Sequence, residues 1–268
     1  GVHVSPDPDL VTYWLTGEID EERGWGIAGD GFNTFERMAL VGAPDWFSLS
    51  DRDLGACLYR RIFLDEGGRQ TDAQAQIARQ LGARAKVLPM CDEPVRTRVK
   101  TAAGWRGLQE FLIVDRAEGA IEGVEVGGLD QAKPTTEVLE ALQSAEAIVI
   151  GPSNPVISIG PILSVPGMRE AIASSPAPVL AVSPFVGGHS LKGPTEACMA
   201  AVGRPPTAAG VASLYEGLLD GIVHDSEEPE PPPALPALAC PTLMEGSEGR
   251  RALAERTLKF AATLDKYG

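Results

Sequence analysis

Two apolar patterns alternate along the second half of the chain and predict an α/β protein. Runs rich in Ile, Val and Leu, with little polar alternation, occupy 146–150 and 178–182, and a shorter run lies at 220–224. Such runs are typical of strands covered on both faces, as in a parallel sheet. The segments between and after them predict helices at 134–144, 166–174, 195–202, 207–217 and 248–264. Strands that alternate with helices favour a mainly parallel sheet packed between helices.

The beginning of the chain is predicted to be mostly helical, and the middle to be rich in strands. Helices are expected at 10–15, 32–40, 51–66 and 71–81, and the third would place Leu54, Cys57, Leu58 and Ile62 on one face. More polar strands are expected at 85–88, 96–101, 108–114 and 121–126. The predicted fold is a Rossmann-like three-layer α/β/α core with a mainly parallel sheet, plus a smaller helical and antiparallel subdomain. We expect one domain made of three segments: 1–84, 85–133 and 134–268.

Two loops at the ends of predicted strands are candidate ligand sites. The first reads GPSNPVISIGP, and its glycines and hydrogen-bonding groups are Gly151, Ser153, Asn154, Ser158 and Gly160, with Pro155 between them. The second carries Ser183 and the pair Gly187-Gly188, with Lys192 nearby. Open α/β sheets bind ligands at the carboxyl ends of their strands, and the helix after the first loop would suit a phosphate. An ordinary strand-to-helix connection remains the alternative.

The composition limits the partners and the compartment. A net charge of −14 argues against nucleic acid, and it means that a phosphorylated substrate needs backbone amides, Arg or a divalent metal close by. No apolar run reaches membrane-spanning length, and no signal peptide is visible. The four cysteines lack paired metal-ligand spacing, so Cys57 and Cys198 are expected to be reduced core residues of a cytoplasmic protein. The acidic, proline-rich stretch 225–236 is predicted to be a surface linker.

Several charged and aromatic residues near the beginning of the chain admit two interpretations each. Asp7 and Asp9 lie in SPDPD, where they could cap a helix or hold a divalent cation from a proline-stiffened loop. Arg52 stands in an acidic first turn, so it could meet a partner anion or pair with Asp51 or Asp53. Asp92 could line a site or stabilise a turn. Trp14 and Trp25 could stack on a flat ring or fill a small core.

The first loop and its surroundings resemble the 2-phospho-L-lactate transferase family. The resemblance rests on GPSNPVISIGPIL followed by VPGMREA, and on further segments in the same order along nearly the whole chain: SPDPDLVTYWL, IDEERGWGI, LSDRDL, VLPMCDEPVRT, SPFVGGHSLKGP, GVASLYEGLLDG and TLM. In the family, a first strand and a glycine-rich turn precede SPDPD. Here the chain begins at Gly1-Val2-His3, and we expect that this element is omitted from the sequence rather than lost.

The resemblance implies a transferase of coenzyme F-420 biosynthesis. It moves a phospholactyl or phosphoenolpyruvyl group from a guanosine diphosphate (GDP)-linked donor to the ribityl hydroxyl of the deazaflavin Fo, and GMP leaves. By this resemblance the protein needs Mg²⁺ and forms a homodimer. The implied metal and catalytic residues are Asp7 and Asp9. The implied donor-binding residues are those of the two loops, in the segment 134–268. The implied Fo-binding residues, in the segment 1–84 and just beyond it, are Asp9, Trp14, Ser48, Asp51, Arg52 and Asp92.

Two rival functions belong to other classes. The first is a UDP-sugar-binding regulatory protein of the related gluconeogenesis-factor family, whose equivalent loop reads like GPGSLYTSI; Ser153-Asn154-Pro155 replaces that pattern here. The second is a dinucleotide-dependent oxidoreductase, which would need a GxGxxG turn directly after a strand, and none of the predicted strands is followed by one. Donors that carry lactate or enolpyruvate differ by two hydrogens, and the sequence does not separate them.

Overall fold

The computed structural model describes residues 2–229 and 235–264. Contacts along the chain divide it into two compact units, Gly1–Asp92 and Glu93–Gly268. We call these the first and the second unit and describe each by itself. No helix within the described ranges is long and apolar enough to cross a membrane.

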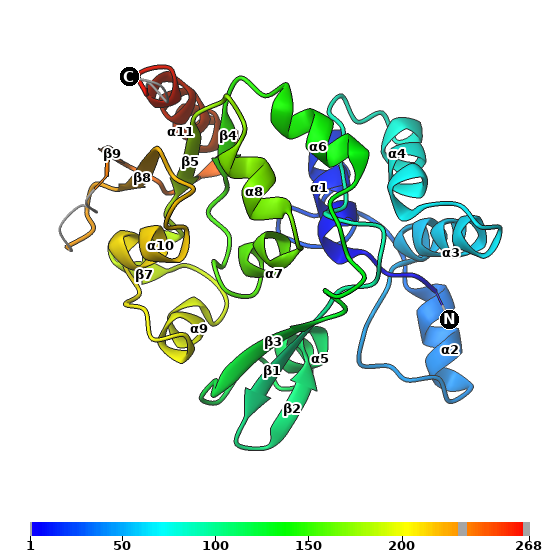
Figure 1. Ribbon diagram of the computed structural model, residues 1–268. Helices are drawn as coiled ribbons and strands as arrows, with labels where there is room; N and C mark the ends of the chain where they lie inside the picture. Colours follow the sequence, from blue (N-terminus) through cyan, green and yellow to red (C-terminus); the bar gives the residue numbers. More distant parts are fainter. Residues whose placement is uncertain (1, 230–234, 265–268) are drawn as a thin grey trace. The chain divides into compact units, whose positions relative to one another are not determined.

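The first unit contains the predicted helices, with two changes. The helices are α1 (Pro6–Thr16), α2 (Asn33–Leu40), α3 (Asp51–Asp65) and α4 (Gln70–Gln80) (Figure 1). The prediction that SPDPD forms a loop is wrong, because α1 begins at Pro6, where the fixed φ of proline suits a first turn. The predicted inner face of α3 is only half right: Leu54 and Cys57 are buried, but Leu58 and Ile62 are exposed.

The second unit is built on a four-stranded parallel sheet, as predicted. Its strands are β4 (Ile148–Ile150), β5 (Val179–Val182), β8 (Gly221–Asp225) and β9 (Ala237–Cys240), in the order β4-β5-β8-β9. Every residue of β5 and β8 is buried, as their apolar runs predict. β4 is different, because it forms an edge of the described sheet and Val149 is 42% exposed. The expectation that this strand is covered on both faces is therefore wrong.

The sequence analysis missed the strand β9 and placed the start of the acidic linker too early. We expected 220–224 to be the last strand, yet β9 pairs with β8 from Ile222↔Ala237 to Asp225↔Cys240. Asp225 is a buried strand residue, so the linker cannot begin there. Residues 230–234 of the predicted linker lie outside the described residues. The short strand was missed because its alanines carry little β signal.

Helices flank the parallel sheet (Figure 1). They are α6 (Thr136–Gln143), α7 (Ile159–Ser164), α8 (Met168–Ala173), α9 (Thr195–Ala201), α10 (Ala208–Leu214) and α11 (Gly246–Ala261). α10 contacts β8 and α11 contacts β5. Leu253 of α11 packs with Val182, Val223 and Cys240, and this cluster forms part of the core. The arrangement confirms the predicted α/β class.

A three-stranded antiparallel sheet in the order β2-β1-β3 completes the second unit. Its strands are β1 (Arg96–Thr101), β2 (Gly104–Gly107) and β3 (Gly123–Gly127). Two predicted strands are wrong: 108–114 contains the helix α5 (Leu108–Ile113), and 85–88 is irregular. Leu108, Phe111 and Leu112 have the i, i+3, i+4 spacing of a helix face, and Phe111 is fully buried. A run as short as 85–88 cannot be assigned from periodicity alone.

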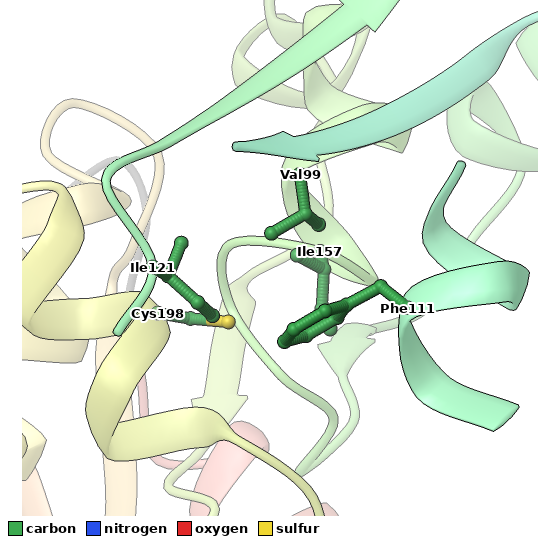
Figure 2. Close-up of a cluster of buried hydrophobic side chains, with 5 residues drawn as sticks. All are labelled: Val99, Phe111, Ile121, Ile157 and Cys198. Carbon is green, nitrogen blue, oxygen red and sulfur yellow. The ribbon is translucent and has the colours of Figure 1, made fainter. Parts of the chain in front are cut away.

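One apolar cluster joins the antiparallel sheet to the loop after β4. Figure 2 shows Val99 of β1, Phe111 of α5, Ile121, Ile157 of the loop and Cys198 of α9 packed together. All five side chains are buried. The residues from 93 to 133 therefore share a core with the loop that follows the parallel strand β4, and Ile157 fixes that loop by burying its side chain.

Candidate functional site

A buried ion pair lies at the centre of the first unit. Asp9, in the first turn of α1, is 3% exposed, and Arg60 of α3 is 0% exposed. The Arg60 guanidinium donates to Oδ1 of Asp9, to Oε1 of Gln74 (3.0 Å) and to the backbone oxygen of His3 (3.0 Å). Gln74 in turn donates to Oγ1 of Thr12 at 3.0 Å. Buried charges persist only when they are paired and hydrogen-bonded, so this network locks Asp9 in one orientation.

The second oxygen of Asp9 has a different environment. Its Oδ2 is buried and has no hydrogen-bond partner within the part of the chain that the structure describes. Ligand atoms of Asp9, Asp53 and Cys57 lie within 4.8 Å of one another, and Oδ1 of Asp53 accepts from the Tyr13 hydroxyl at 2.9 Å. Burial raises the pKa of Asp9 to about 6, against the opposing effect of Arg60, and it also raises the pKa of Asp53. Two crowded carboxylates and an unsatisfied oxygen suit a cation.

Two of the three residues in this cluster suit a hard divalent cation such as Mg²⁺, and the third does not. Two carboxylates match the preference of Mg²⁺ for oxygen ligands. The Cys57 thiol does not, because soft sulfur prefers other metals and because burial raises its pKa to about 12. The cluster therefore offers Asp9 and Asp53 as ligands, and its remaining ligands would be water or substrate oxygens.

The two predicted metal ligands Asp7 and Asp9 are not brought together. Both belong to α1, where residues two apart point to different sides of the helix. Asp7 is exposed, whereas Asp9 is buried against Arg60. The capping role that we considered for SPDPD is also absent in its simple form, because Ser5 at the N-cap makes no side-chain cap hydrogen bond. Its Oγ instead accepts from Nε2 of Gln70 at 3.1 Å.

Two carboxylates of the first unit stabilise the starts of α2 and α3. Asp51 accepts from the backbone amides of Asn33 (3.2 Å) and Thr34 (2.9 Å) at the start of α2, and these contacts lower its pKa to about 2. Asp30 accepts from the Arg52 amide at 2.8 Å at the start of α3. The Arg52 side chain pairs with Asp30 at 3.7 Å, so the predicted partners Asp51 and Asp53 are wrong. Such interactions satisfy the amides that a helix start leaves unpaired.

Asp92 has the same kind of role at α4. Its Oδ1 accepts from the amide and the hydroxyl of Thr71, both at 2.8 Å, and its Oδ2 accepts from Nε of Arg69 at 2.9 Å. The remaining predicted Fo-binding residues lie on the surface: Trp14 is 37% exposed, and Ser48 is also exposed. Trp25 is 49% exposed, with the Arg23 guanidinium 5.6 Å from its ring centroid. The interpretation of both tryptophans as core residues is therefore wrong.

The loop after β4 is shaped by Asn154. The side-chain Oδ1 of Asn154 accepts from the amides of Val156 (2.9 Å) and Ile157 (3.1 Å), and its Nδ2 donates to Oγ1 of Thr195 on α9 (3.4 Å). Gly151 and Ser153 are exposed, whereas Pro155 is buried. The prediction that the next helix begins at 166 is wrong, because the helix α7 begins just after Ser158 and includes Gly160. The exposed part of the loop is therefore its beginning, at Gly151 and Ser153.

The loop after β5 is a small hairpin, which the sequence did not reveal. Ser183 is buried and its Oγ accepts from the amide of Phe185 at 3.3 Å. β6 (Phe185–Val186) and β7 (His189–Ser190) then pair around Gly187 and Gly188. Both glycines have positive φ, 57° and 82°, as tight two-residue hairpin turns require. Because β4 and β5 are neighbours in the sheet, the two candidate loops leave adjacent strand ends, as predicted.

Three residues of these sites escaped the sequence analysis. Arg60 was missed because an arginine in a helix is normally assigned to the exposed face. Its spacing was the available signal, because it lies three residues after buried Cys57 on the same helix face. Asp53 was noted only as a first-turn acid. Asp225 was assigned to the linker, yet its Oδ1 accepts from the Gly187 amide at 3.2 Å.

Comparison with known proteins gives the family. The sequence model of 2-phospho-L-lactate transferase CofD matches residues 1–235. The 2-phospho-L-lactate transferase of Methanosarcina mazei is 39% identical over 257 residues, 94% of this chain and 84% of that protein. The phosphoenolpyruvate transferase of Streptomyces griseus is 38% identical over 273 residues, 97% of this chain and 86% of that protein.

Solved structures agree on the fold. Two structures of a Bacillus halodurans protein of the UPF0052 family superpose with TM-scores of 0.56 and 0.53, at 20% and 21% identity. They cover 78% and 77% of this chain, and 73% and 72% of the Bacillus chain. At this identity the likeness concerns the fold alone. The match of the family model over most of the chain, together with relatives of more than 30% identity, shows that the chain belongs to the 2-phospho-L-lactate transferase CofD family.

Proposed function

We propose a specific reaction for this transferase of coenzyme F-420 biosynthesis. The terminal ribityl hydroxyl of Fo attacks the phosphorus that carries the lactyl or enolpyruvyl group in a GDP-linked donor. A new phosphorus–oxygen bond forms to Fo, the bond to the bridging oxygen breaks, and GMP leaves with that oxygen. The hydroxyl proton passes to a nearby base. Phosphoryl transfers of this kind depend on positioning and on stabilising the charge of the phosphate oxygens.

The single observation that carries this proposal beyond the family is the state of Asp9. One carboxylate oxygen is held by Arg60, and the other is buried without a partner among the described residues, beside Asp53. We propose that Asp9 and Asp53 hold Mg²⁺, which would supply positive charge for phosphate oxygens in the transfer. The exposed Asp7 is no longer a favoured ligand. Asp9 itself is fixed by Arg60, so it can hold its orientation while substrates enter and leave.

The donor is proposed to bind at the second unit, by the loops that follow β4 and β5. The exposed Gly151 and Ser153 and the Gly187-Gly188 turn support this assignment, because they lie at the carboxyl ends of neighbouring parallel strands.

Fo is proposed to bind at the first unit, where Trp14, Trp25 and Ser48 are accessible. The capping aspartates Asp51 and Asp92 would support this surface indirectly, through α2 and α4. We also propose a cytoplasmic homodimer, whose assembly state sedimentation of the purified protein tests.

The direct test combines purified protein, Fo, Mg²⁺ and either the lactyl or the enolpyruvyl GDP-linked donor. The expected product is Fo plus the substituted phosphate, identified by mass, together with one GMP for each product. Absence of product with both donors would overturn the proposal. The relatives include both named activities at nearly equal identity, so the preferred donor follows from comparing the two rates.

A second experiment separates the proposal from the regulatory alternative. Thermal melts with GDP, a UDP-sugar and NAD are expected to shift only with GDP, because a ligand stabilises the native state that binds it. A shift with the UDP-sugar and none with GDP would favour a UDP-sugar-binding protein. A shift with NAD alone would favour an oxidoreductase. A Mg²⁺ titration of the melting temperature, without substrates, tests the metal site apart from turnover.

A further inference from the structure

Asp225 joins three chain segments at the carboxyl end of β8. It is 3% exposed, and its carboxylate accepts hydrogen bonds on both oxygens. Oδ1 accepts from the amides of Gly187 (3.2 Å) and Glu227 (3.0 Å). Oδ2 accepts from the amide (2.9 Å) and the hydroxyl (3.0 Å) of Thr242, just after β9. The carboxylate therefore connects the β6–β7 hairpin turn to two strands of the parallel sheet.

The hairpin needs such an anchor because its own pairing is short. β6 and β7 pair through only Phe185↔Ser190 and Val186↔His189, and a two-residue pairing is marginal by itself. At its far end, Glu196 of α9 accepts from the amide (2.9 Å) and the hydroxyl of Ser190. At the turn, the Asp225 side chain holds Gly187. Gly188 lies so close to Pro229 that an added Cβ would come within 3.0 Å of its Cδ.

The position of this turn matters for a ligand at the sheet edge. The turn follows β5, and Asp225 ends the neighbouring strand β8, so both lie where open α/β sheets bind ligands. The Gly187 amide is engaged by Asp225 and is not the donor that meets an anion. A carboxylate at such an edge would repel a diphosphate, and the four hydrogen bonds that Asp225 accepts offset its charge.

We propose that Asp225 is a positioning residue for the nucleotide diphosphate, which fixes the Gly187-Gly188 turn against the sheet edge without contacting the ligand. This inference rests on the proposed function, because it takes the loop after β5 as part of the donor site. Asp225→Asn keeps the size of the side chain but leaves one acceptor oxygen. Whichever way the amide is turned, two of the four donors lose their partner.

The test compares Asp225→Asn with Asp220→Asn. Asp220 lies before the amino end of the same strand, and its Oδ2 accepts from the Val179 amide at 2.8 Å. Both variants weaken contacts around β8, but only the first lies at the proposed ligand edge. GDP titrations are expected to show about tenfold weaker binding for Asp225→Asn and a near wild-type Kd for Asp220→Asn. Amide hydrogen exchange should be faster at 185–190 in Asp225→Asn alone.

The outcomes distinguish this inference from the function on which it rests. Equal GDP affinity in the two variants, or unchanged exchange at 185–190, overturns the positioning role and leaves the proposed function standing. A wild-type protein that does not bind GDP overturns both. If Asp225→Asn does not fold, Thr242→Val is the milder variant, because it removes one of the four donors and keeps the side-chain shape. It is expected to weaken GDP binding by a few-fold, and an unchanged Kd would again overturn the inference.

Discussion

Arg60 holds one oxygen of Asp9 and leaves the other without a partner among the described residues. The pair is formed by side chains 51 positions apart, on α1 and α3, and both are almost completely buried. A structural ion pair needs no unsatisfied oxygen, since such an atom lowers stability. The unsatisfied oxygen supports the proposal that Asp9 has a second partner, although Nε of Arg60 is also buried without one among the described residues.

Asp9→Asn is expected to abolish most transfer activity and to lower stability. The variant leaves the buried Arg60 guanidinium without a countercharge, which costs about 3–5 kcal/mol of unfolding free energy. Urea denaturation and turnover across a Mg²⁺ titration measure the two effects. Asp7→Asn is the matched control, because Asp7 is exposed on the same helix turn, and it should change stability by no more than about 0.5 kcal/mol. Full activity in Asp9→Asn would remove Asp9 from the metal site.

Asn154→Ala is expected to loosen the loop after β4. The substitution removes the acceptor of the Val156 and Ile157 amides, and each unsatisfied amide costs about 1–3 kcal/mol where it stays buried. We expect a lower melting temperature and weaker GDP binding, with little change in Fo binding. Ser174→Ala is the control, because Ser174 is exposed at the end of α8 and lies outside both candidate loops. Equal losses for GDP and Fo would contradict a local role at the donor site.

The cap at the start of α2 is expected to respond to acid. The backbone amides around Thr34 lower the pKa of Asp51 from 3.8 to about 2. A depressed carboxylate pKa stabilises the folded state above the unfolded pKa, and this contribution is lost as pH falls from about 4 towards 2. Asp51→Ala should therefore be less stable than wild type at pH 6, and the difference should shrink in that window. The exposed Asp45 gives the control Asp45→Ala. A difference that stays constant down to pH 2 would argue against the carboxylate cap.

The cysteines are expected to resist alkylation in the native protein. Cys57, Cys91, Cys198 and Cys240 are all buried thiols outside any disulfide, and burial raises the pKa of Cys57 to about 12. Thiolates are the reactive form, so iodoacetamide at pH 8 should label the cysteines only after denaturation. Mass spectrometry of native and denatured samples measures the labelling. Rapid modification of Cys57 in the native state would show that the Asp9 cluster is open to solvent.

The sequence by itself determined the class of fold and the family. The apolar runs at 178–182 and 220–224 predicted β5 and β8, because a strand buried on both faces is mostly apolar. The helix boundaries of α2 and α3 followed from local spacing and first-turn acids. The GPSNP loop and SPDPD carried the resemblance that the comparisons confirmed. All of these signals are local, so they can be read along the chain.

Only the tertiary structure decided which polar residues work together. Asp7 and Asp9 are neighbours in sequence but lie on different sides of α1, whereas Asp9 and Arg60 meet across two helices. Asp51 and Asp92 proved to cap helices that begin well before them in the chain. The sequence analysis placed Asp225 in a linker, whereas in the structure its carboxylate anchors a hairpin turn. Long-range hydrogen bonds leave no periodic trace in the sequence, because any polar residue can satisfy them once the fold brings it near.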